Sequence, residues 1–149
     1  MKIRAFVFDD NDIIRSLVSS ILKKRGYEVY EFLDAGTCPL FLEYECPCPL
    51  NYTCGDFIIT DIHMPSMTGL DFIENQLRQG GCKSMNFAVM SADWTDLQLQ
   101  QAKRLGCYVL KKPFDPQELI DWLVECEKKI DPKRKLSDWF KFKDKKTSH

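Results

Sequence analysis

Short runs of apolar residues alternate along the chain with longer segments in which apolar residues recur every three or four positions. The short runs are typical of buried β-strands and the longer segments of amphipathic helices. The pattern predicts five strands, at Ile3 to Phe8, Tyr27 to Leu33, Phe57 to Thr60, Met85 to Met90 and Tyr108 to Leu110. It also predicts five helices, at Asp12 to Arg25, about Leu40 to Tyr44, Ser66 to Gln79, Asp93 to Leu105 and Asp115 to Ile130. This alternation favours an α/β fold with a parallel sheet.

Local signals mark the ends of two of these helices. Asp12 is the candidate N-cap of the first helix, and Gly26 is the residue type that commonly ends one. Asp115, followed by Pro116 and then by Glu118, is a strong start signal for the last helix.

The composition is that of one globular domain. The chain has 149 residues, of which 44% are hydrophobic and 29% charged, with a net charge of −1. These values argue against a membrane protein, a large enzyme and a two-domain regulator, and no apolar run approaches the ~20 residues of a membrane span. Asp9 and Asp10 come too early for a signal peptide, so a cytoplasmic location is expected.

The near-neutral total conceals a division of charge. Residues 1–130 carry 14 basic and 19 acidic side chains, whereas residues 131–149 carry 7 and 3. We therefore expect an acidic domain over 1–130 and a basic tail over 131–149. Trp139 and Phe140 are expected to fold back onto the domain or to meet a partner, with the tail's charges solvated. The tail is too short for a DNA-binding domain, so no direct DNA binding is expected.

Polar side chains follow four of the predicted strands. Asp9 and Asp10 follow the first, Asp61 the third, Ser91 the fourth, and Lys112 the fifth. Ligands of open parallel sheets bind at the carboxyl ends of the strands, so these side chains are expected to converge. Clustered carboxylates need a cation among them, and oxygen ligands suit Mg²⁺. With a lysine and a hydroxyl beside it, such a site suits phosphoryl transfer.

These motifs together resemble a receiver domain of bacterial response regulators over about residues 1–130. They are Asp9-Asp10, Asp61-Ile62-His63-Met64-Pro65 with Gly69, Ser91-Ala92 and Lys112-Pro113-Phe114. The resemblance implies a flavodoxin-like, doubly wound sheet of five parallel strands in the order 2-1-3-4-5, with five helices. Together with the length of the chain, it leads us to expect a stand-alone receiver with no output domain attached.

The resemblance implies a role for each acidic position. Asp61 corresponds to the phosphate-accepting aspartate. Asp10 corresponds to the direct ligand of Mg²⁺ or Mn²⁺, Asp9 to a ligand acting through water, and the backbone carbonyl of His63 to a third protein ligand.

It implies roles for the remaining positions as well. Ser91 corresponds to the hydroxyl that moves to bond the phosphoryl group, and Lys112 to the lysine that pairs with it, in a cis bond to Pro113. His63 and Asp93 occupy the positions that tune the lifetime of the phosphoryl group.

One departure from the family concerns its aromatic switch residue, three positions before the lysine. That place is Val109 here, and Tyr108 lies one residue away. Either Val109 replaces the aromatic ring or the register differs and Tyr108 takes the role. For the same reason, Lys111 is an alternative to Lys112 as the lysine of the site.

As the resemblance implies, the protein is not a conventional enzyme but catalyses its own phosphorylation and dephosphorylation. The donor is a sensor histidine kinase or a phosphotransfer protein. A downstream protein reads the face made by the fourth helix and fifth strand, and a dimer through that face is an alternative.

Two other functions compete. A phosphohydrolase of the haloacid dehalogenase class would use a strand-one aspartate as nucleophile, with Ser91 and Lys112 as later motifs. This chain lacks the acidic motif that the class has after the lysine. The phosphohydrolase interpretation also leaves Asp61 and the Met64-Pro65 turn unexplained. A pseudo-receiver that acts only as an interaction module usually lacks the acidic set.

Four of the seven cysteines lie close together, at Cys38, Cys46, Cys48 and Cys54. They lack a CxxC pair, so they match no common zinc arrangement. Segment 46–55 contains two prolines and a glycine and is predicted as a loop, within an enlarged region of about 36–55. The thiols either pack as small hydrophobic groups or form a second metal site or a redox-sensitive pair.

Overall fold

The main sheet has five strands, all parallel. The computed structural model describes residues 1–34, 52–78 and 85–137. The strands lie in the order β2-β1-β4-β5-β6, which is 2-1-3-4-5 among the five predicted strands, so the doubly wound, flavodoxin-like fold is confirmed. Their bounds are β1 (Arg4–Phe8), β2 (Glu28–Phe32), β4 (Phe57–Asp61), β5 (Asn86–Ser91) and β6 (Tyr108–Lys111).

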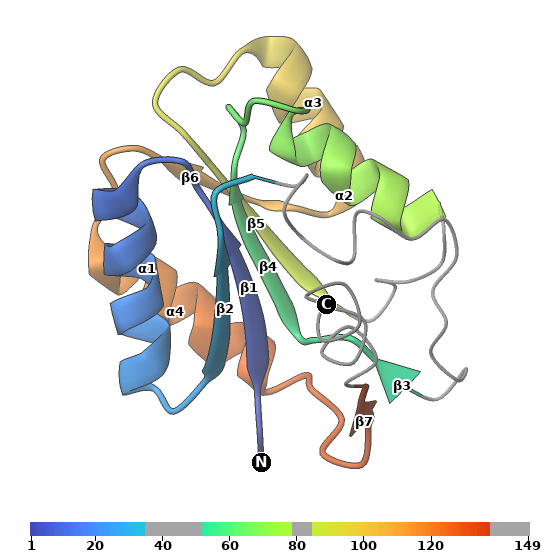
Figure 1. Cartoon of the computed structure of the whole chain (residues 1–149). Helices are drawn as coiled ribbons and strands as arrows, with labels where there is room; N and C mark the ends of the chain where they lie inside the picture. Colours follow the sequence, from blue (N-terminus) through green and yellow to red (C-terminus); the bar gives the residue numbers. More distant parts are fainter. Residues whose placement is uncertain (35–51, 79–84, 138–149) are drawn as a thin grey trace, which may run out of the picture.

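Helices cover both faces of the sheet (Figure 1). α1 (Asp12–Lys24) and α4 (Pro116–Glu127) lie on one face, and α2 (Gly69–Arg78) and α3 (Asp96–Leu105) on the other. The described ranges contain four helices, and the fifth, predicted near residues 40–44, falls outside them. The predicted fourth helix and fifth strand are therefore α3 and β6.

Strand β1, which lies next to the central strand β4, shows how the two helix layers share the core. Phe6 and Phe8 pack towards α2 and α3, whereas Ala5 and Val7 pack towards α1 and α4. All four side chains are fully buried. A strand buried on both faces is apolar at every position, and this is why the strands appear in the sequence as continuous apolar runs.

The starts of α1 and α3 differ from the prediction. Asn11, not Asp12, caps α1, and its side chain accepts hydrogen bonds from two backbone N–H groups of the first turn. Thr95 caps α3 in a capping box with Gln98, so this helix does not begin at Asp93. In both cases several residues able to cap lie within a few positions, and the one that caps has the extended backbone that a cap requires.

Two helices are shorter than the sequence predicts. α2 begins at Gly69 rather than Ser66, and α4 ends at Glu127 rather than Ile130. The predicted start of α4 is confirmed: Asp115 accepts from the backbone N–H of Gln117, and Pro116 is the first helical residue.

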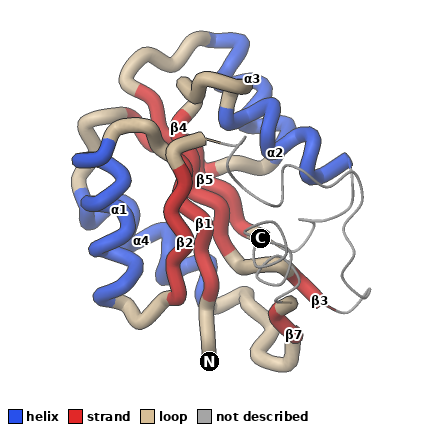
Figure 2. Tube along the Cα trace, in the orientation of Figure 1, coloured by secondary structure: helices blue, strands red, loops and turns tan. Residues whose placement is uncertain are grey.

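A second, two-stranded sheet lies at the amino end of the main strands (Figure 2). β3 (Tyr52–Thr53) pairs in parallel with β7 (Lys135–Leu136). The first belongs to the segment predicted as a loop, and the second to the predicted tail. Residues 131–137 of that tail therefore pack against the domain.

Arg134 fixes this part of the tail to the main sheet. Its guanidinium binds both carboxylate oxygens of Asp56, at 2.5 and 2.6 Å, and donates to the backbone carbonyl of Lys2 at 2.6 Å. The buried Arg4 donates to the carbonyl of Ser137 at 2.6 Å. The prediction that the tail's charges are solvated is therefore wrong for Arg134, because it has a buried carboxylate to pair with.

Candidate functional site

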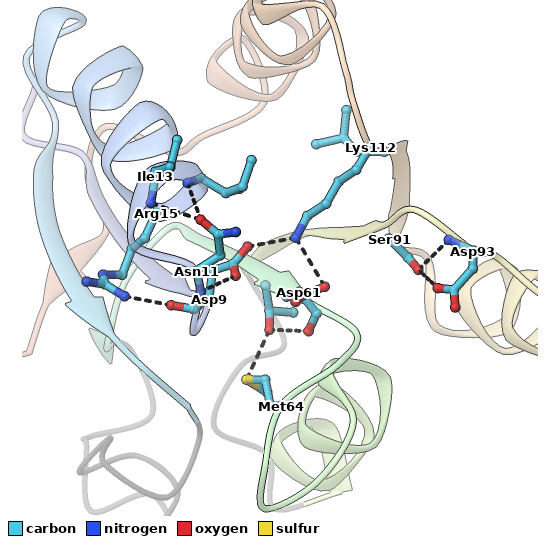
Figure 3. Close-up of polar contacts among 12 residues, drawn as sticks. Asp9, Asn11, Ile13, Arg15, Asp61, Met64, Ser91, Asp93 and Lys112 are labelled. Carbon is cyan, nitrogen blue, oxygen red and sulfur yellow. Dashed lines mark hydrogen bonds and ion pairs between the residues drawn. The ribbon is translucent and has the colours of Figure 1, made fainter.

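Polar side chains from four strands meet at the carboxyl edge of the main sheet (Figure 3). Asp61 and Ser91 are the last residues of β4 and β5, Asp9 follows β1, and Lys112 follows β6. The convergence that the sequence predicted is present.

Lys112 lies between two carboxylates. Its Nζ is 2.9 Å from Oδ2 of Asp9 and 3.4 Å from Oδ1 of Asp61. Lys111 is exposed, so Lys112 is the lysine of the site. The Lys112–Pro113 peptide bond is cis, as the resemblance implied.

The two buried carboxylates differ in their environment. Asp9 is fully buried, and its second oxygen accepts the backbone N–H of Asn11 at 2.9 Å. Asp61 keeps 6% of its surface exposed. Burial raises the pKa of Asp61 above its ordinary value; Lys112 opposes this rise and the charge of Asp9 adds to it. Asp61 is thus the carboxylate that both contacts the lysine and keeps contact with solvent.

Three aspartates could hold a cation. One carboxylate oxygen from each of Asp9, Asp10 and Asp61 lies within 4.8 Å of the other two. Asp10 is exposed, so water could complete the coordination. All-oxygen ligands of this kind fit Mg²⁺ or Mn²⁺. Within the described ranges this is the one such group of His, Cys, Asp or Glu side chains.

The cysteine cluster is only partly described. Cys54 is 1% exposed and packs in the core beneath α2 and α3, as the hydrophobic interpretation predicted for the thiols. Cys38, Cys46 and Cys48 lie outside the described residues. The second metal site therefore stays a prediction.

Ser91 is fully buried, and its hydroxyl turns towards Asp93 rather than Asp61 (Figure 3). It donates to Oδ1 of Asp93 at 2.9 Å. The same oxygen lies 2.8 Å from Nε2 of His63. The hydrogen bonds from His63 and Ser91 lower the pKa of Asp93. The two positions expected to tune the site are thus in contact with each other, and Asp93 also contacts Ser91.

Val109 and Tyr108 face opposite sides of the sheet. Tyr108 stacks on Trp122 of α4, with ring centroids 5.4 Å apart, and donates to Glu118 at 3.2 Å. Val109 packs on the α2 and α3 side together with Val89. Val109 pairs with Val89, and Val89 and Ser91 are alternate residues of β5, which share a face of the sheet. Val109 therefore lies on the same face as Ser91. The geometry favours Val109 as the residue in the switch place.

Two residues that position the site were missed at the sequence level. Asn11, through its cap and its N–H bond to Asp9, orders the turn after β1. Arg15 on α1 donates to the backbone carbonyl of Asp9 at 2.8 Å. The position of Asn11 directly before the helix was a signal that it could cap it. No pattern in the sequence indicated the contact of Arg15.

The turn between β4 and α2 depends on a close approach. The N–H of Gly69 donates to the carbonyl of Ile62 at 3.0 Å. A Cβ added at Gly69 would lie 2.3 Å from the carbonyl oxygen of Asp61. Glycine is therefore required where the helix begins next to the strand that carries Asp61.

The fold and this edge define a doubly wound α/β protein with an acidic, lysine-containing site. A model of the response regulator receiver domain matches residues 5–124, and the chain belongs to this family. No helix in the described part of the chain is long and apolar enough to cross a membrane.

Similar proteins include both single receivers and longer regulators. The chain is 27% identical to the probable chemotaxis protein CheY of Rhizobium etli, over 79% of this chain and 87% of that protein. It is 28% identical to the alkaline phosphatase synthesis transcriptional regulatory protein SphR of Synechococcus elongatus, over 78% of this chain and 46% of SphR. The chain spans half or less of the length of several curated relatives that it matches.

Solved structures share the fold. The chemotaxis response regulator CheY4 of Vibrio cholerae superposes with a TM-score of 0.68 at 28% identity, covering 85% of this chain and 99% of that one. A receiver domain of a putative LuxO repressor protein from Vibrio parahaemolyticus superposes with a TM-score of 0.71 at 16% identity, covering 87% and 92%.

Proposed function

We propose that this chain is a phosphorylation-dependent switch in which Asp61 accepts a phosphoryl group. The donor would be the phosphohistidine of a sensor histidine kinase or of a phosphotransfer protein. The observation that carries the proposal is the position of Lys112, whose ammonium contacts Asp61 and Asp9 at the edge where ligands of such sheets bind. Membership of the receiver family supports the same conclusion.

The chemical step follows from the position of Asp61. A carboxylate oxygen of Asp61 attacks phosphorus, forming a P–O bond while the P–N bond to the donor imidazole breaks, and that imidazole takes up a proton. Lys112 is in place to bind a phosphoryl oxygen. Hydrolysis reverses the modification: water attacks phosphorus, the carboxylate of Asp61 leaves, and inorganic phosphate is released.

Asp9, Asp10 and Asp61 would hold Mg²⁺ or Mn²⁺. When bound, the ion would neutralise charge on the phosphoryl oxygens. The backbone carbonyl of His63 is proposed as a further ligand.

The output would be a changed surface on α3 and β6. Phosphorylation adds charge and acceptor oxygens at Asp61, and Ser91 turns inward to donate to one of them. Ser91 ends β5, which pairs with β6, so its movement reaches the strand beside α3. A downstream protein, or a second copy of the chain, would read this face.

The test is labelling with acetyl phosphate and Mg²⁺, followed by mass spectrometry. We expect one phosphoryl group on the wild type, none on Asp61→Asn, and normal labelling of Asp71→Asn, a variant of an exposed aspartate on α2. Absence of an adduct on the wild type would overturn the proposal.

The same variants separate the two competing functions. A phosphohydrolase that uses Asp9 or Asp10 as nucleophile would keep turning over a phosphate ester after Asp61→Asn. The structure gives that enzyme little support, because Asp9 is fully buried and both its oxygens are already hydrogen-bonded. A pseudo-receiver would bind its partner equally well with either asparagine variant and would take up no label.

A further inference from the structure

Three side chains, from the end of β5 and from the loops after β4 and β5, form a continuous polar bridge beside Asp61. Oδ1 of Asp93 accepts the hydroxyl of Ser91 at 2.9 Å and lies 2.8 Å from Nε2 of His63. The backbone N–H of Asp93 donates back to the Ser91 oxygen at 3.1 Å. We call these three residues the Ser91–Asp93–His63 bridge.

We propose that Asp93, held by His63, is a positioning residue that keeps the hydroxyl of Ser91 turned away from Asp61 until a phosphoryl group arrives. The proposal rests on the function proposed above, and it concerns the regulation of that same site.

The first step of the argument is the single proton of a serine hydroxyl. A hydroxyl donates one hydrogen bond at a time. While Ser91 donates to Asp93, it has no proton to give to a phosphoryl oxygen on Asp61. In Figure 3 the hydroxyl points to Asp93 while Lys112 points to Asp61, so lysine and serine do not act on Asp61 together in this state.

The second step is the difference in burial along the bridge. Ser91 is fully buried, whereas the side chains of His63 and Asp93 are 59% and 73% exposed. A buried hydroxyl needs a hydrogen-bond partner, and Asp93 supplies it from the surface. Both outer residues can be changed without opening the core.

The third step is the support of the bridge at each end. His63 lies two residues after Asp61, so its contact with Asp93 joins the loop after β4 to the loop after β5. On the other side, the indole N–H of Trp94 donates to the carbonyl of Leu110 on β6 at 3.0 Å. The segment 91–94 is therefore anchored to the loop after β4 and to β6, and the hydroxyl of Ser91 is the part that can rotate between two acceptors.

The experiment measures binding of beryllium trifluoride with Mg²⁺, a phosphoryl analogue, by isothermal titration calorimetry. Asp93→Ala should bind about fivefold more tightly than the wild type, because one competing hydrogen bond to Ser91 is lost. Losing a negative charge near an anion also favours binding, so the decisive comparison is made in a Ser91→Ala background. There Asp93→Ala should lose this fivefold gain, and only the smaller effect of the charge should remain.

Three further variants complete the design. Asp96→Asn removes an exposed charge from the same region and reports the effect of charge alone. His63→Ala should tighten binding about twofold, because Asp93 is less firmly held, and His63→Gln, which keeps a side-chain donor, should restore the wild-type value. Thermal unfolding of the His63 and Asp96 variants should match the wild type, since both side chains are exposed, and the Ser91 and Asp93 variants are compared with the wild type below their melting temperatures.

Each outcome bears on one proposal. Equal gains from Asp93→Ala in the wild-type and Ser91→Ala backgrounds would overturn the bridge as a device acting on Ser91. No change with Asp93→Ala, while the wild type binds the probe, would overturn it as well. Failure of the wild type to bind the probe at all would instead overturn the proposed function.

Discussion

At the scale of single residues, the site depends on atoms that approach closely without steric conflict. The carboxylate of Asp9 is held by the N–H of Asn11 and by Lys112, and the ammonium of Lys112 is held by Asp9 and Asp61. Gly69 contributes by lacking a side chain. An added Cβ there would also lie 2.8 and 2.9 Å from the side chain of Thr60.

We expect Gly69→Ala to lower the free energy of unfolding by about 2 kcal/mol and to slow labelling of Asp61, because backbone at the end of β4 must shift. Chemical denaturation and the acetyl phosphate rate measure the two effects. Gly26→Ala is the control: this residue has a φ of +87° but open space around it. It should cost about 1 kcal/mol and leave labelling unchanged. Equal labelling rates in Gly69→Ala and wild type would contradict the expectation.

At the scale of elements, the apolar runs predicted the five main strands, but local signals could not select each helix start. Asp9 to Asp12 offers four residues that could cap α1, and only the backbone path after β1 selects Asn11. For α3 the pair Thr95 and Gln98 was available in the sequence as a capping box. The start of α2 was not, because it depends on the contact of Gly69 with β4.

The ends of α1 and α4 are joined by a charged group. Arg25 binds both oxygens of Glu127, at 2.6 and 3.0 Å, and Tyr27 donates to the same carboxylate. Burial acts to raise the pKa of Glu127, but the hydrogen bonds from Arg25 and Tyr27 outweigh it, so the pKa is lowered from 4.5.

A lowered pKa in the folded state gives stability that is present above the ordinary pKa and lost as pH falls through the lowered value. Glu127→Gln should therefore reduce the free energy of unfolding by about 1 kcal/mol at pH 7, and the difference from wild type should shrink below pH 4.5. Urea denaturation over a pH series checks this. Glu125→Gln, in the same helix but 66% exposed, should change little at any pH. A difference that persists at low pH would contradict this origin.

At the scale of the whole molecule, the unexpected feature is the packing of residues 131–137 at the end of the sheet opposite the site. This segment carries Arg134, which neutralises the buried Asp56 beside the first residue of β4. The backbone N–H of Arg4 also donates to Asp56, at 3.0 Å. We therefore propose that the folded receiver extends beyond residue 130 to at least Ser137.

Arg134→Ala should lower the free energy of unfolding by about 3 kcal/mol, because it leaves a buried carboxylate without its cation. Lys133→Ala, at the neighbouring exposed position, should be nearly neutral. Thermal and urea unfolding measure both variants. Acetyl phosphate labelling of Asp61 should survive in Arg134→Ala below its melting temperature, since Arg134 lies at the opposite end of the sheet from Asp61. Equal stability of the two variants would show that residues 131–137 are not part of the folded unit.

The sequence by itself determined the order of the five main strands and of the four described helices, and the set of polar residues at the carboxyl edge. It could do so because buried parallel strands are continuously apolar and their polar ends stand out, and the motifs keep their register from Asp9 to Lys112. Only the tertiary structure decided which group each of these side chains contacts. The pairing of Arg134 with Asp56 joins residues 78 positions apart. The contact of His63 with Asp93, the acceptor of the Ser91 hydroxyl, joins residues 30 positions apart on separate loops. Such contacts depend on the distances between folded elements, which no local pattern of residues contains.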